Sequence, residues 1–167
     1  MANNYTSPAE WSRMARAVAE ATDLGIRAAR AHDLENFADA VEQLENHTEA
    51  TRDLHAHMVR ELLETQYQDG VSGDDVSEVL TRTVGGAGLW NVPVDPSAVA
   101  MVLTVALGVG ESSDTSDAPA TTIPPAEIIG AAILVVADLA ASAAIHHEPS
   151  LVRAMEEIRR AQTVEMP

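Results

Sequence analysis

The chain contains no cysteine, no lysine and few aromatic residues, since Phe, Trp and Tyr together make up 3 % of its 167 residues. Without cysteine it has no disulfide, no thiolate nucleophile and no cysteine metal site, which agrees with a reducing cytoplasm. The first residues carry neither a basic start nor an apolar stretch, so no signal peptide is expected. With so few aromatics, a core must be built from Ala, Leu, Val and Ile at close spacing, and this composition favours helices over sheets.

Acidic residues outnumber basic ones by 26 to 10, and the formal net charge is −16. Proteins that bind nucleic acids gain affinity by neutralising phosphates, so a chain of this charge is expected not to bind nucleic acid. The same charge would attract a basic protein. An acidic partner, or a mimic, for a basic protein is therefore one alternative function.

Asp138 is the only charged residue in the apolar run of residues 128–145. This run has about the minimum length of a membrane span, but a central Asp costs about 2.5 to 3.5 kcal/mol on insertion, while each good apolar residue returns only about 0.3 to 0.6. A buried core helix is therefore predicted, and no membrane contact. A carboxylate buried in such a helix needs partners or must hold its proton.

Hydrophobic periodicity and helix-capping residues predict an all-α single domain over residues 1–167, a bundle of about six helices without strands. Ser7 and Pro8 resemble a helix start, and the glycines at 85, 86 and 88 are expected to end a helix at Val84. Residues 110–125 are poor in apolar side chains and are expected to form a mobile acidic loop. The predicted helices cover residues 7–31, 34–67, 74–84, 97–109, 125–145 and 150–163.

The first two predicted helices would form a long N-terminal antiparallel hairpin. The segments 97–109 and 125–145 are almost wholly apolar and need cover on nearly every side. The hairpin supplies part of this cover and a second copy of the chain supplies the rest, so an intertwined homodimer is the expected assembly.

The apolar stripe of the second helix is interrupted by Thr48, Thr51 and His55. Such a polar middle forms either a satisfied polar layer or the wall of a polar pocket. Trp90, beside the glycines, would anchor a lid, an interface or the core. The residues expected to bind a ligand are Thr48, Thr51, His55, Trp90 and Asp138.

Asp138 and His55 are also the candidate catalytic residues. If both face one cavity, a carboxylate in an apolar wall has a raised pKa and a nearby imidazole can share its proton, as in general acid–base chemistry. The structural alternative is that Asp138 accepts hydrogen bonds from Ser142, from a threonine or from a helix terminus, or pairs with an arginine, and only fixes packing.

Asp53, His57 and Glu61 follow one another at four-residue spacing, so they lie on one helical face and are weak candidates for metal ligands. The same spacing is common on solvent-facing helices. His146 and His147 close an apolar helix, where the helix dipole favours an imidazolium. Neither a metal nor another cofactor is therefore expected.

These observations leave three functions open. The first is a non-catalytic module that binds a hydrophobic small molecule or a protein. The second is a small cofactor-free enzyme that uses Asp138 and His55 as an acid–base pair on a hydrophobic small molecule. The third is the acidic partner of a basic protein. No residues in the chain carry a motif of a known family.

Overall fold

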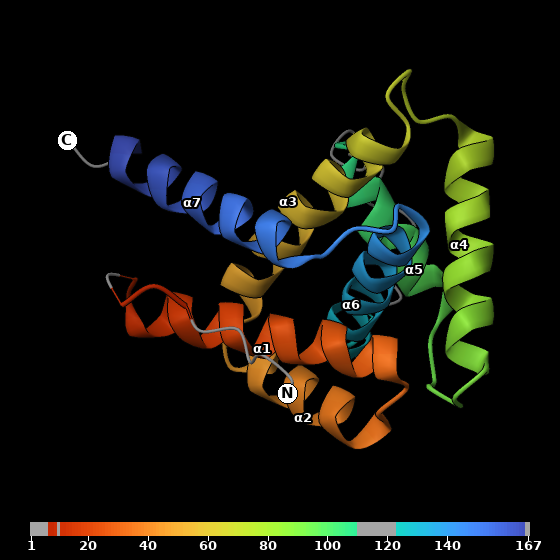
Figure 1. Ribbon diagram of the computed structural model, residues 1–167, viewed down its shortest axis with the longest axis horizontal. Coiled ribbons are helices and arrows are strands. Elements are labelled where there is room, and N and C mark those ends of the chain that lie inside the picture. Colours follow the sequence, from red (N-terminus) through yellow and green to blue (C-terminus); the bar gives the residue numbers. More distant parts are fainter. Residues whose placement is uncertain (1–6, 10, 110–122, 166–167) are drawn as a thin grey trace, which may run out of the picture.

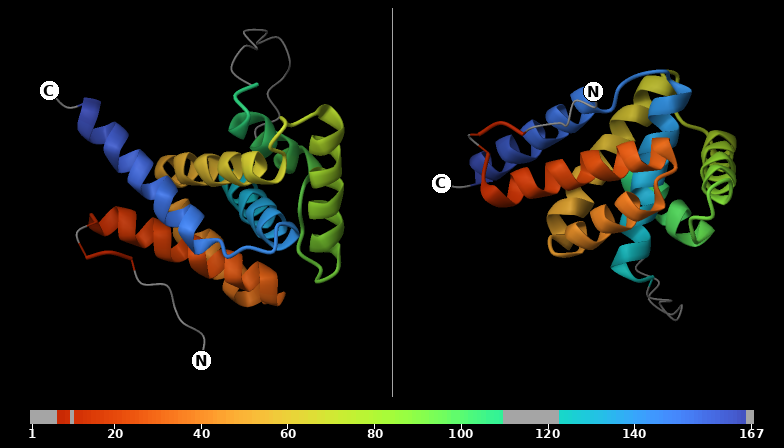
Figure 2. Two further views of the ribbon diagram at one scale, coloured as in Figure 1. Left: turned by 45° about the horizontal axis from the view of Figure 1, so that its top comes forward. Right: turned by 60° about the horizontal axis from the view of Figure 1, so that its bottom comes forward.

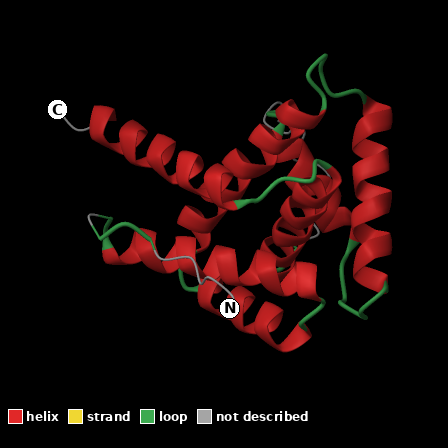
Figure 3. Ribbon diagram, viewed as in Figure 1, coloured by secondary structure: helices red, strands yellow, loops and turns green. Residues whose placement is uncertain are grey.

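The computed structural model describes residues 7–9, 11–109 and 123–165, and within these ranges the chain forms helices and no strand (Figure 3). The expected all-α class is therefore confirmed, with seven helices in the described ranges instead of about six. Most of the expected loop, residues 110–122, lies outside the described residues. The helices are α1 (Arg13–Ala31), α2 (Leu34–Glu45), α3 (Thr48–Gln66), α4 (Gly73–Gly88), α5 (Pro96–Ala106), α6 (Pro125–Ser142) and α7 (Glu148–Glu165).

The apolar helix α6 lies at the centre and packs against α1, α2, α3, α4 and α5 (Figure 1). From Ile129 to Ala140 all of its residues are buried except Asp138. By length and composition α6 could cross a membrane, and it is the one described helix that could. Five helices of the same chain therefore cover most of α6.

The helix expected over residues 34–67 is in fact two helices, broken at Asn46 and His47. The last carbonyls of α2 have no partners within that helix, so they need other donors. The Thr48 hydroxyl donates to the Glu45 carbonyl at 3.0 Å, and the Thr51 hydroxyl donates to the Leu44 carbonyl at 3.4 Å. The polar middle of the predicted stripe is therefore in part a helix junction.

Two predicted helix ends are also wrong. Helix α1 begins at Arg13, and its N-cap is Ser12, whose hydroxyl accepts a hydrogen bond from the Ala15 amide at 3.1 Å. Ser7 is buried and donates to Glu20 instead. Helix α4 continues through its glycines to Gly88, because local propensity for a turn is weak beside the hydrogen bonds and packing of the whole helix.

Gly25 is a point of close contact between α1 and α6. A Cβ atom built on this glycine would lie 2.8 Å from Ile133 Cδ1 and 3.3 Å from Ala40 Cβ. The glycine thus lets one turn of α1 lie against both α2 and α6. Gly85 of α4, by contrast, lies in open space, since a Cβ atom built there would meet no atom within 4 Å.

We expect Gly25→Leu to lower the free energy of unfolding by about 1–3 kcal/mol, because the added side chain overpacks the α1–α6 contact. The same substitution at exposed Gly85 is expected to raise it by up to about 1 kcal/mol, because leucine is the better helix former. Urea denaturation of the two variants measures both effects. Equal effects at the two positions would show that α1 does not lie this close to α6.

Candidate functional site

A pocket of about 470 Å³ lies between α3, α5 and α6. Its α5 edge is partly open, since Met101 and Val105 are 38 % and 48 % exposed. Hydrocarbon side chains from α5 and α6 form most of the wall, and polar residues come from one stretch of α3. The lining residues are Thr48, Thr51, Arg52, Asp53, His55, Ala56, Met101, Val102, Val105, Ile128, Ile129 and Ala132.

Three of the residues expected to bind a ligand, Thr48, Thr51 and His55, are brought together in this pocket. The two threonine hydroxyls donate to carbonyls at the end of α2, so they cannot give the same proton to a ligand. His55, unlike the two threonines, is a buried polar residue of the wall that does not bond to the carbonyls at the end of α2.

His55 is 3 % exposed, and its Nε2 lies 3.0 Å from the hydroxyl oxygen of Thr22 on α1. Burial lowers the pKa of His55 from 6.5 to about 4, because the charged form loses its hydration. The imidazole is therefore neutral at pH 7, with one nitrogen that donates and one that accepts. In the wall of the pocket it offers a hydrogen bond and no charge.

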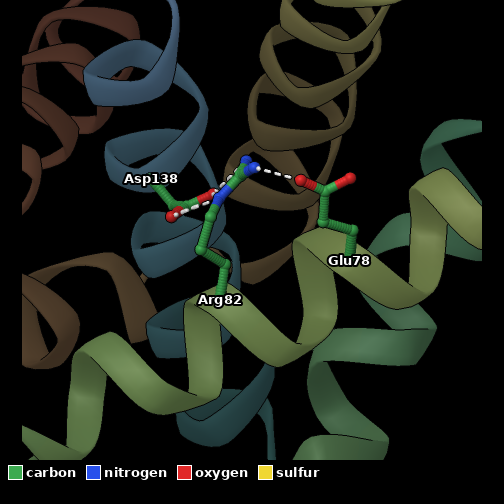
Figure 4. Close-up of polar contacts among 3 residues, drawn as sticks. All are labelled: Glu78, Arg82 and Asp138. Carbon is green, nitrogen blue, oxygen red and sulfur yellow. Dashed lines mark hydrogen bonds and ion pairs between the residues drawn. The ribbon is translucent and has the colours of Figure 1, made fainter.

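Asp138 does not share this pocket. Its carboxylate pairs with Arg82 of α4, with Nη2 to Oδ2 at 2.7 Å and Nε to Oδ1 at 3.1 Å, and Arg82 also reaches Glu78 (Figure 4). The hydrogen bond to Asp138 raises the pKa of Arg82 above its ordinary value. The expected acid–base pair of Asp138 and His55 therefore lacks the common cavity it needs, and the arginine alternative is the one observed.

Asp138 and Trp90 instead line a second hollow of about 340 Å³ between α1, α4 and α6. The Trp90 ring stacks on His32, with ring centroids 5.5 Å apart and planes 6° from parallel, and meets the edge of Phe37 at 5.4 Å. The five residues expected to bind a ligand are thus divided between two separate sites.

The weak metal candidates are used in other ways. His57 Nδ1 donates to the backbone carbonyl of Asp53 at 2.9 Å, and Glu61 pairs with Arg153 of α7. Over the described ranges, no group of three or more histidine, aspartate or glutamate side chains is placed to hold a metal ion.

The buried carboxylate that the sequence did not reveal is Asp23, which is 1 % exposed. Its Oδ1 lies 2.7 Å from His147 Nε2, and its Oδ2 accepts a hydrogen bond from Arg27 Nε at 2.9 Å. His147 therefore does not close α6 as expected, because α6 ends at Ser142 and the ring ties the start of α7 to α1. The one local signal for Asp23 was its place between Ala19 and Ile26 on a buried stripe of α1.

A second contact of the same kind fixes α7 to α3, where Arg153 and Ser150 both bind the Glu61 carboxylate. Figure 2 shows α7 lying beside α3 and α1, the two helices that it contacts. These polar contacts add to the buried apolar side chains of Leu151 and Met155 in fixing the first turns of α7.

No family model matches the chain, and comparison with the curated proteins and with the solved structures gives no match. Its function must therefore be argued from the geometry of its own pockets.

The lowered pKa of His55 predicts how stability depends on pH. The folded-state pKa of about 4 lies below the unfolded value of 6.5, so unfolded chains take up the proton first as the pH falls. The contribution of neutral His55 to the free energy of unfolding is complete above pH 6.5. About 3 kcal/mol of this contribution is lost on acidification to pH 4.

We expect the free energy of unfolding of the wild type to fall relative to that of His55→Gln as the pH decreases from 6.5 to 4. Glutamine keeps a polar group near Thr22 but does not titrate. Denaturant unfolding of both proteins at several pH values measures the difference. A difference that stays constant between pH 6.5 and 4 contradicts a buried, neutral His55.

The Arg82–Asp138 pair predicts a non-additive double-mutant cycle. Arg82→Met leaves the Asp138 carboxylate, which is 17 % exposed, without its partner and is expected to cost about 1–2 kcal/mol. Arg82 itself is 31 % exposed, so solvent screening keeps the cost in this lower range. The double variant Arg82→Met/Asp138→Leu is expected to be more stable than the sum of the single variants predicts, by about 1 kcal/mol. Strictly additive unfolding energies would contradict the pairing.

Proposed function

We propose that the protein is a non-catalytic binding protein for a neutral, hydrophobic small molecule, held in the pocket between α3, α5 and α6. The observation that carries this proposal is a buried His55 in a wall otherwise dominated by hydrocarbon, where burial lowers the pKa of the imidazole and favours its neutral form. Ligand sites are commonly hollows of about 300–1,000 Å³ with apolar walls and a few polar points, and a volume of about 470 Å³ falls in this range.

The polar groups of the pocket favour an uncharged ligand. Arg52 and Asp53 carry opposite charges on consecutive, exposed residues of α3, so this pair gives the pocket no net charge. The neutral imidazole of His55 can exchange a hydrogen bond with a hydroxyl or carbonyl group of the ligand. Burial of apolar ligand surface, at about 25 cal/mol per Å², then supplies the affinity.

A catalytic role finds less support. The proposed acid–base pair is separated between two hollows, and the Asp138 carboxylate is held by Arg82. The acidic-partner alternative rests on the net charge of −16, without a described surface that selects a partner.

We propose a homodimer as the assembly, with a cytoplasmic location and without contact to nucleic acid or membrane. The dimer is supported by α5, which has no charged residue and presents Met101 and Val105, four residues apart, to solvent. A second copy laid on this face would cover the open edge of the pocket. The absence of cysteine supports the cytoplasmic location, and the net charge of −16 argues against binding to nucleic acid. The burial of α6 inside the bundle argues against membrane contact.

Binding of Nile red, a neutral apolar dye with one carbonyl group, tests the proposed function. We expect saturable fluorescence enhancement with the wild type. Val105→Phe should weaken it by about tenfold, because the larger ring enters the open edge of the pocket. Leu89→Phe enlarges a side chain that is 78 % exposed just after the end of α4 and should leave dye binding unchanged.

Native mass spectrometry of the freshly purified protein provides the complementary measurement, since it reports the number of subunits and any retained ligand. Extra mass that is absent from Val105→Phe would support the proposal. Nile red affinity that is equal in the wild type and Val105→Phe would place the dye elsewhere and overturn it.

A further inference from the structure

The hollow between α1, α4 and α6 has a chemistry different from that of the first pocket. Small or apolar side chains form its floor, namely Ala29, Ala87, Leu134, Ala137 and Ala141. The other lining side chains are the rings of His32 and Trp90, two guanidinium groups, a threonine and the Asp138 carboxylate, whose charge is balanced by Arg82. At about 340 Å³ the hollow is large enough for a molecule of one or two rings.

The aromatic wall is held in a defined orientation. His32 follows α1 with a left-handed backbone, φ 58°, and its amide closes the helix on the carbonyls of Ala28 and Ala29. Glycine is the usual residue in this conformation, because other side chains adopt it at a cost. Here the side chain of His32 stacks on Trp90, and Phe37 fixes the edge of the same indole.

Two arginines line the hollow, and they differ in their partners. Arg82 is held by Asp138 and Glu78, so its charge is balanced. Arg30 is exposed and makes no ion pair within the described ranges. In a chain with 26 acidic residues, an arginine left unpaired at the rim of an aromatic hollow offers a site for one negative charge.

Thr83 is the remaining polar residue of the hollow. Its side chain is 3 % exposed, and its hydroxyl has no hydrogen-bond partner among the described residues. A buried hydroxyl without a partner costs about 1–3 kcal/mol. A helical threonine has two accessible rotamers, so rotation about χ1 can turn this hydroxyl toward an acceptor in the hollow.

From these groups we infer a second binding site in this hollow, for a small aromatic carboxylate. The ligand's ring would lie on the apolar floor beside Trp90, and its carboxylate would accept hydrogen bonds from Arg30 and Thr83. One unpaired guanidinium matches a single negative charge, whereas a phosphate dianion would meet stronger repulsion from a chain of charge −16. This site is independent of the pocket proposed for neutral ligands.

Calorimetric titration with 2-naphthoate tests the inference, with 2-naphthamide as an uncharged probe of the same shape. We expect the wild type to bind naphthoate more tightly than naphthamide. Arg30→Gln should weaken naphthoate binding by about tenfold and leave naphthamide binding unchanged. Arg60→Gln, which changes the net charge equally at an exposed site on α3, should bind both probes as the wild type does.

Thr83 provides a second, separate test. Thr83→Val keeps the shape of the side chain and removes the hydroxyl, so the free protein should keep or gain stability while naphthoate binding weakens. Thr83→Ser should restore the binding. Val105→Phe, which obstructs the other pocket, should leave naphthoate affinity unchanged and so separates this site from the proposed function.

Either of two results would overturn the inference. One is equal naphthoate affinity in Arg30→Gln and Arg60→Gln, and the other is the absence of saturable naphthoate binding to the folded wild type.

Discussion

The burial of α6 is the constraint on which the rest of the structure depends. An 18-residue helix whose residues from Ile129 to Ala140 are buried, apart from Asp138, needs apolar surface around nearly its whole circumference. Five helices, α1 to α5, supply it. The outer faces of α1 to α4 carry charged residues, whereas α5 has none. Asp138, the one charged residue between Ile129 and Ala140, pairs with an arginine from α4. Both hollows lie where helices diverge around this central helix.

Much of this could be predicted from sequence, because burial leaves a periodic trace. The apolar run of residues 128–145 with its single Asp138 identified the core helix. The low aromatic content of the whole chain pointed to closely packed helices. The interruption by Thr48, Thr51 and His55 identified residues that do come together at one pocket. A polar interruption of an apolar stripe shows which face of a helix carries buried polar residues, and it can be recognised without knowing which helices pack against that face.

The features that could not be predicted depend on partners distant in sequence. Asp23 and His147 are 124 residues apart, and nothing near either residue indicates the other. Likewise, Asp138 and His55 are both unusual in sequence, but α6 and α3 direct them to different hollows. The break at Asn46 and the passage of α4 through its glycines are decided by small differences in energy, in which tertiary packing outweighs local propensity.

The two histidine contacts of α1 come from consecutive residues, since Thr22 binds His55 of α3 and Asp23 binds His147 at the start of α7. Successive side chains of a helix point about 100° apart, so these two hydrogen bonds hold α1 from two different directions. Rotation of α1 about its own axis would break both contacts at once. His55 in the wall of the first pocket and His147 at the base of α7 are therefore both fixed to α1, through two neighbouring residues of that helix.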